Sequence, residues 1–133
     1  MSIIMQYGKG TGAGNRGTGR KTELWSNSDP TSSFAAQTVN LSDSVTNYDF
    51  LLVTYAFSTG SQDFSSVLIP VSEIYTNAAQ YNLNINAGAN NRTGNRKINV
   101  PTATTAAFGT AAFNGSASSN GNVIPLAIYG IKL

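Results

Sequence analysis

Hydrophobic and polar residues alternate along much of the chain with a period of two. The clearest case is residues 81–86, where Tyr81, Leu83 and Ile85 alternate with three asparagines. Because successive side chains of a β-strand point to opposite faces, this pattern predicts a strand with one buried and one solvated face. Residues 50–57 are instead almost continuously apolar, with many β-branched and aromatic side chains. They predict a central strand that is buried on both faces.

Shorter apolar segments predict further strands at residues 22–25, 38–41, 66–69, 97–100, 106–113 and 124–132. The residue types that turns select separate them, at 29–30, 42–44, 59–61, 90–95, 114–115 and 120–121. One short helical turn is expected near residues 71–77, after Pro70. Trp25 follows Leu24 in a predicted strand, and we expect it in the core rather than on a sugar-binding platform. Closely spaced strands without long helical patterns between them predict an all-β domain, an antiparallel β-sandwich or jelly roll.

The first 21 residues differ from the rest in composition. Six of the 13 glycines fall between Gly8 and Gly19, a stretch with no apolar residue larger than alanine. Such a segment cannot offset its ordering entropy by burial, so we expect an extended, basic, Gly-rich arm at 1–21 and the β domain at 22–133. The apolar residues at the start of the arm are expected to anchor it on a neighbour, by adding a strand or filling a pocket. The predicted anchoring residues are Ile3, Ile4, Tyr7, Lys9, Arg16, Arg20 and Lys21.

Charged residues are sorted by sign into three blocks. Residues 1–22 hold four bases and no acid, residues 23–91 hold all six carboxylates and no base, and residues 92–133 hold the other four bases. Like charges cannot pair with each other, so they are solvated, or they meet the opposite block of the same fold or of a neighbouring copy. The net charge of +2 therefore hides surfaces of opposite sign, a pattern that favours assembly.

The chain contains no histidine and no cysteine. A Ser-His-Asp triad, a Cys-His pair, a zinc site of the Cys/His type and a redox disulfide are therefore excluded within it. The remaining catalytic option is a carboxylate-pair glycosidase, which needs two acids roughly 5 to 10 Å apart in one groove. We therefore expect no enzyme, and no cofactor or metal site.

Two strings in the arm come close to phosphate-binding motifs. Gly12, Gly14 and Gly17 match the spacing of the dinucleotide fingerprint, and residues 14–22 miss the phosphate loop by one inserted arginine. Both motifs depend on a strand and a glycine turn that open a helix, and no helical periodicity follows here, so the arm is the preferred interpretation. No segment approaches 18 apolar residues and no export signal is visible, so we expect synthesis in a cytoplasm and no membrane partner.

A second basic cluster spans residues 91–97. Its candidate contact residues are Asn91, Arg92, Asn95, Arg96 and Lys97. The cluster is interpreted either as a solvated hairpin tip or as a contact loop for an acidic neighbour, a phosphate or a charged glycan. No aromatic residue lies between Tyr81 and Phe108 to stack on bases, so nucleic acid is not expected as a partner.

Four strings of the chain carry a resemblance to a known family. They lie at residues 24–39, 48–50, 69–72 and 124–132. In these strings, residues 22–133 resemble a small β domain that recurs in structural proteins of tailed bacteriophages, as a short free-standing chain or at the end of tail-fibre and minor structural proteins. The resemblance implies a role on the virion surface or in attachment, usually as a symmetric oligomer. It implies no catalytic residue.

These observations favour a virion structural protein, present in many copies and attached to a capsid or tail by its arm. We expect a homo-oligomer, with a trimer preferred because the charge blocks can pair between subunits in a closed ring. A second hypothesis is a receptor-binding tail-fibre tip, whose loops at residues 90–97 and 115–122 contact host surface glycans. A third is a lectin-like carbohydrate-binding module.

Overall fold

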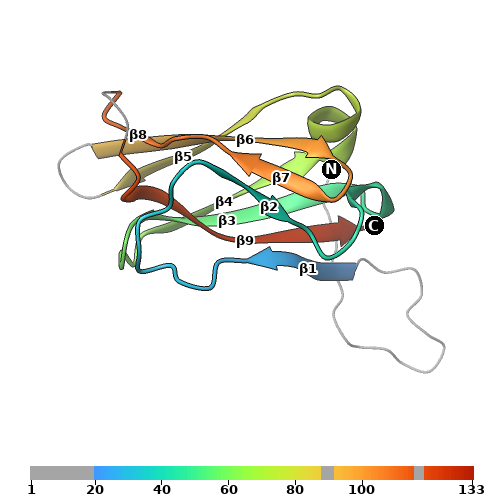
Figure 1. Ribbon diagram of the computed structural model, residues 1–133, viewed down its shortest axis with the longest axis horizontal. Helices are drawn as coiled ribbons and strands as arrows, with labels where there is room; N and C mark the ends of the chain where they lie inside the picture. Colours follow the sequence, from blue (N-terminus) through green and yellow to red (C-terminus); the bar gives the residue numbers. More distant parts are fainter. Residues whose placement is uncertain (1–19, 88–91, 116–118) are drawn as a thin grey trace.

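A computed structural model of the protein describes residues 20–87, 92–115 and 119–133. Within these residues, nine strands form two antiparallel sheets that pack face to face as a β-sandwich (Figure 1). The predicted all-β sandwich is therefore confirmed. The glycine-rich part of the arm, at residues 1–19, lies outside the described residues.

The first sheet, sheet A, has the strand order β1-β9-β3-β4. Its strands are β1 (Arg20–Ser26), β9 (Asn122–Lys132), β3 (Phe50–Ser58) and β4 (Phe64–Pro70). The second, sheet B, has the order β2-β7-β6-β5, with the short β8 also paired to β6. Its strands are β2 (Gln37–Asn40), β7 (Thr105–Phe108), β6 (Arg92–Thr102), β5 (Tyr81–Ala87) and β8 (Ala112–Phe113).

The core lies between the two sheets. It is built from the side chains that point inward at alternate positions of each strand. β5 follows the predicted pattern, because Leu83 and Ile85 are buried while its three asparagines are exposed. Two short helical segments close the sandwich at one end, η1 (Val45–Asn47) and the π-helical η2 (Ser72–Thr76). The second of these confirms the helical turn expected near residues 71–77.

Trp25 lies at the border of the core and is half-buried. Its ring centre lies 6.0 Å from that of Phe34 and 5.5 Å from that of Phe108. The expectation that Trp25 packs with the core is confirmed.

The expectation that β3 is buried on both faces is wrong. Leu51 and Val53 are fully buried, whereas Phe50, Leu52 and Thr54 on the other face are only half-buried. No described element covers this outer face of sheet A, so the apolar side chains there pack only against their neighbours in the sheet. The more continuously buried strand is β9, which lies between β1 and β3.

Two predicted boundaries in sheet B are also wrong. The strand expected at residues 106–113 is divided into β7 and β8, because the chain leaves β6 at Gly109 and rejoins it at Ala112. The turn expected at residues 90–95 is shorter, because β6 begins at Arg92 and pairs with β5 along its first seven residues. Most of the predicted contact loop is therefore strand.

Candidate interaction surfaces

β1 begins at Arg20, so two of the predicted arm residues belong to the sandwich. Arg20 pairs with Lys132 and Lys21 with Ile131. The Lys21 ammonium also lies 4.4 Å from the centre of the Tyr129 ring. The assignment of Arg20 and Lys21 to the arm is wrong, because β9 continues to Lys132 and offers both of them a backbone partner. The remaining predicted anchoring residues lie outside the described residues: Ile3, Ile4, Tyr7, Lys9 and Arg16.

Charges from opposite blocks meet within one subunit at this end of the sandwich. The Lys132 ammonium lies 3.9 Å from the carboxylate of Asp49, which also accepts a hydrogen bond from the Leu133 N–H at 2.9 Å. The Tyr48 hydroxyl donates to Asp43 at 2.8 Å and holds the pKa of that carboxyl below its usual value, with the charge of Arg20 adding in the same direction. These charges have partners in their own fold and do not require a neighbouring copy.

The ring of Tyr48 lies directly on the backbone of Gly130. A Cβ atom at Gly130 would approach the ring carbons to 2.6 Å, closer than any real contact. Tyr48 is itself buried, with its hydroxyl fixed on Asp43. Glycine at this position therefore lets η1 and the following residues close against β9.

Arg96 is fully buried, which contradicts its assignment to a contact loop. Its inward direction follows from the alternation of β6, in which Gly94, Arg96 and Ile98 face the core. The guanidinium donates to three backbone carbonyls, those of Val123 at 2.8 Å, Gly109 at 2.7 Å and Asn122 at 3.0 Å. Burial lowers the pKa of Arg96 to about 10, so it remains charged at neutral pH. Arg96 therefore ties sheet B to the start of β9.

The other predicted contact residues do not form one surface. Asn95 and Lys97 are exposed on the outer face of sheet B, and the Lys97 ammonium lies 3.4 Å from the amide oxygen of Asn82. Arg92 lies at the start of β6, with its guanidinium 5.3 Å from the centre of the Phe57 ring. Asn91 lies outside the described residues. A single basic contact loop at residues 91–97 is therefore not formed.

Several connecting segments gather at the end of the sandwich opposite the start of β1. Gly94 pairs with Phe113, and the Asn114 N–H donates to the Thr93 carbonyl at 2.7 Å. These contacts hold the segments that flank residues 88–91 and 116–118 side by side. The β3–β4 turn joins them, since the Thr59 N–H donates to the Gly121 carbonyl at 3.2 Å. We call this group of segments the loop end; it lies on the left in Figure 1, and β1 begins on the right.

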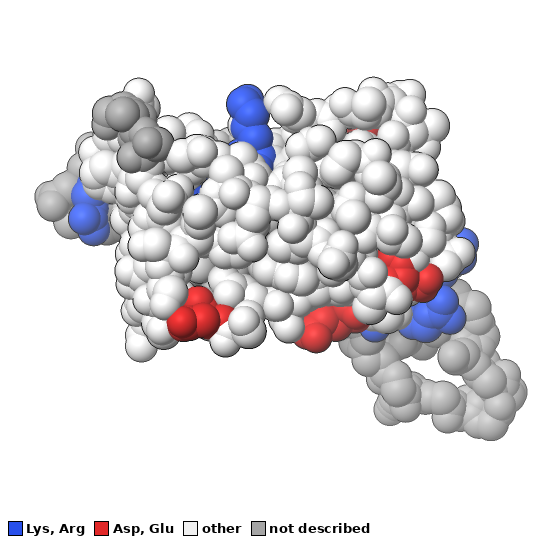
Figure 2. Space-filling model, viewed as in Figure 1, with Lys and Arg blue, Asp and Glu red and all other residues white. Residues whose placement is uncertain are grey.

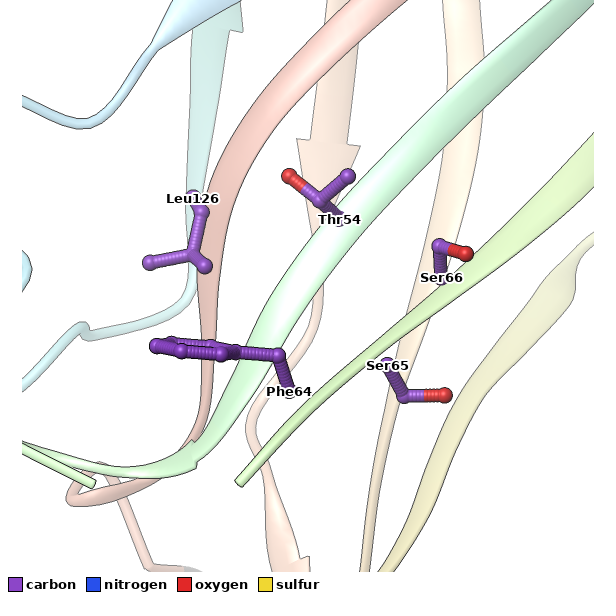
Figure 3. A pocket seen from close by; sticks show the side chains of 5 residues that line it. All are labelled: Thr54, Phe64, Ser65, Ser66 and Leu126. Carbon is purple, nitrogen blue, oxygen red and sulfur yellow. The ribbon is translucent and has the colours of Figure 1, made fainter. Parts of the chain in front are cut away.

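Sheet A carries an apolar hollow on its outer face, near the loop end. The hollow has a volume of about 390 Å³ and is lined by Thr54, Phe64, Ser65, Ser66 and Leu126. Figure 3 shows the Phe64 ring extending below Leu126, while the Ser65 hydroxyl points away from them. A smaller hollow of about 310 Å³ adjoins it and shares Phe64 and Leu126. We refer to the larger one as the Phe64 hollow.

Exposed apolar side chains continue this surface along the sheet. Phe64 is 62% exposed and Leu68 is 39% exposed, and both belong to β4. Leu68 lies opposite Leu52 of β3, which lies opposite Tyr129 of β9. The outer face of sheet A thus presents a row of apolar side chains next to the hollow.

Four of the six carboxylates accept hydrogen bonds from other residues in the described part of the chain. Asp29 accepts hydrogen bonds from Thr31 and Ser32 in its own turn, which lower the pKa of its carboxyl, with Ser32 contributing most. Glu73 accepts a hydrogen bond from the hydroxyl of Tyr81. Neither hollow is lined by a carboxylate. In the view of Figure 2, most acidic side chains lie along the edge formed by β1, and basic ones adjoin them at the end where β1 begins.

Residues 20–87, 92–115 and 119–133 lack two further kinds of feature. No group of three or more acidic, histidine or cysteine side chains that could hold a metal ion is present there. No helix in this part of the chain is long and apolar enough to span a membrane.

The contacts predicted from the sequence lay in the arm and in the basic cluster at residues 91–97, and the Phe64 hollow was missed. The signal was present in residues 64–68, where Phe64 and Leu68 are four residues apart, a spacing that puts both on one face of a strand. Which face is outward depends on the partner strands, which residues 64–68 do not reveal. No protein-family model matches the chain, and no curated protein is similar to it in sequence.

Proposed function

We propose that the chain is a structural protein of a bacteriophage virion, a multi-copy decoration or accessory subunit on the particle surface. Its N-terminal arm, residues 1–19, attaches it to other virion proteins of the capsid or tail. The family resemblance of residues 22–133 supports the virion role. The absence of histidine and cysteine fits a structural rather than a catalytic task.

The observation that carries this proposal is that the two ends of the sandwich differ. β1, which continues from the arm, starts at one end, and the loop end lies at the other (Figure 1). An arm that binds a larger body through Lys9 and Arg16, the two bases that precede β1, leaves the loop end directed outward. A subunit built in this way projects from the surface that holds its arm.

The arm proposal is tested by deleting residues 2–19, which spares all of β1. Particles from an infection complemented with the truncated chain should lack the subunit, whereas the full-length chain should be incorporated. The thermal midpoint of the isolated truncated protein should match that of the full chain, because the described core contains no residue before Leu24. Incorporation of the truncated chain at the full-length level would refute the proposal.

The loop end favours a second candidate function, a receptor-binding tip. The β6–β8 pairing, of Gly94 with Phe113 and Asn95 with Ala112, joins described residues of the two segments that were expected to contact glycans, at residues 90–97 and 115–122. Under this alternative, the isolated protein binds host cells or a glycan array, and exchanging residues 114–121 for a glycine-serine loop abolishes that binding. A purely architectural subunit binds the particle and not the cell.

A further inference from the structure

The outer face of sheet A has the properties of a docking surface for a short apolar segment. Three large apolar side chains are exposed in the described residues, and two of them, Phe64 and Leu68, lie on β4. The third, Leu133, is the last residue of the chain. Exposed apolar side chains that gather beside a hollow are typical of an interaction site.

β4 is also an unprotected edge. In the described part of the chain it pairs with β3 alone, at the border of sheet A. Its seven residues contain no charged side chain, and its proline is the last of them. The other edge of the sheet, β1, carries Arg20, Lys21 and Glu23. Natural edge strands are commonly guarded by charges, so an uncharged edge next to an apolar hollow suits the addition of another strand.

The charges around the Phe64 hollow are of one sign. Asp63 precedes Phe64, and Asp29 precedes Pro30, which lines the adjoining hollow; both aspartates are exposed. The lining residues of the two hollows include no lysine or arginine. An occupant with an apolar tip and a positive flank is complementary to this surface.

The first residues of the chain have this chemistry. Ile3, Ile4 and Met5 form an apolar tip, Lys9 and Arg16 follow it, and no acid occurs before Glu23. We propose that residues 3–7 of one copy bind the Phe64 hollow and the β4 edge of a second copy. The inference deepens the proposed attachment role of the arm and rests on it.

Geometry favours a neighbouring copy over the same chain. β1 starts opposite Lys132, whereas Leu126 of the hollow lies six residues earlier in β9, about 20 Å away at the rise of a strand. An arm that binds its own hollow must reverse along the sheet. In a neighbouring copy that is shifted along the strands toward the particle, by contrast, the hollow comes level with the start of β1, and the loop ends of both copies still point outward. Contacts between two different surfaces of neighbouring copies form a ring, of which the proposed trimer is one example, where the rotation between copies closes.

The test uses the full-length chain and two complementary variants. Ile3→Asp with Ile4→Asp disables the arm and keeps the hollow, and Phe64→Asp disables the hollow and keeps the arm. Asn84→Asp is the control, because it also introduces an aspartate, at an exposed position of β5. Sedimentation over a range of concentrations should show an oligomer for the full chain and the control, and monomers for each disabled variant. The association constant should fall at least tenfold in each.

Mixing the two disabled variants separates a neighbour from the same chain. One intact arm and one intact hollow remain in the mixture, so it should form a one-to-one dimer and nothing larger. A monomeric mixture, a full-length chain that stays monomeric, or an oligomer that Phe64→Asp leaves unchanged would each overturn the inference. Thermal melts of each variant show whether it is folded, and Leu68→Asp replaces Phe64→Asp if the latter is not.

The sedimentation experiment tests this inference separately from the particle experiment, which tests the proposed function. If the full-length chain is monomeric but the truncated chain still fails to enter particles, the arm binds another virion protein, and the proposed function stands without this inference. If the truncated chain enters particles normally, the proposed attachment role fails whatever the sedimentation result.

Discussion

Replacing Arg96 with lysine should destabilise the sandwich at least as much as replacing it with methionine. The guanidinium binds three carbonyls from two segments, and in the described residues its other close partner is the Phe34 ring, 5.2 Å away. Lysine keeps the buried charge but presents a compact ammonium that cannot match the planar fork. Methionine removes the charge and fills much of the same volume.

The expected sizes follow from the bonds that are lost. A hydrogen bond with a charged donor contributes about 1.5 to 3 kcal/mol, and a buried polar group left without a partner costs about 1 to 3 kcal/mol. Two of the three bonds of Arg96 are only partly buried, so water can replace part of the loss. We expect Arg96→Met to lower the free energy of unfolding by about 2 to 3 kcal/mol. For Arg96→Lys we expect about 3 to 5 kcal/mol, because a buried charge remains incompletely bonded.

Urea unfolding of the purified protein measures both values. Lys97→Ala is the matched control, because Lys97 is the next residue of β6 and is exposed; it should change the free energy of unfolding by less than about 0.5 kcal/mol. The thermal midpoint should fall by roughly 10 °C or more for Arg96→Lys. A loss below about 1 kcal/mol for Arg96→Lys would show that Arg96 does not join the sheets as described.

Two further predictions concern the end of the sandwich where β1 begins. Gly130→Ala should cost about 1 to 3 kcal/mol, because the new methyl group meets the Tyr48 ring; an unchanged urea midpoint would contradict this contact. Asp43 has a lowered pKa in the fold, so its contribution to stability is present above the ordinary value of 3.8 and is lost as the pH falls through the lowered folded value. Thermal midpoints between pH 7 and 2 should therefore fall less steeply at the acid end for Asp43→Asn than for the wild type, and identical profiles would refute the role of Asp43.

The strands were predictable where local pattern alone decides them. In β5 the asparagines mark the solvated face, and in β9 the apolar residues of 124–132 mark a strand. β7 and β8 were not separable in the same way, because residues 106–113 keep an apolar pattern across the break at Gly109. That break depends on the carbonyl of Gly109 turning to Arg96, a contact across 13 residues that local periodicity does not encode.

The site predictions failed for a related reason. Arg96 stands between Asn95 and Lys97, and the polarity of the three side chains predicts that all are solvated. Its burial is possible because the carbonyls of Asn122 and Val123 accept hydrogen bonds from its guanidinium, where Val123 has a φ of +47°. The apolar surface of β4 was missed because no local rule indicates which face of sheet A lacks a cover.

Because Arg20 pairs with Lys132, the first and last strands of the sandwich begin and end next to each other. Neighbouring ends allow a domain to be joined into a circle or placed inside a loop of another protein without stretching either partner. A short linker between residues 132 and 20 would turn β9 and β1 into a hairpin, and the chain could be reopened at Gly60, in the exposed turn at the far end. Such a permuted protein would present new termini about one strand length away from residues 20 and 132.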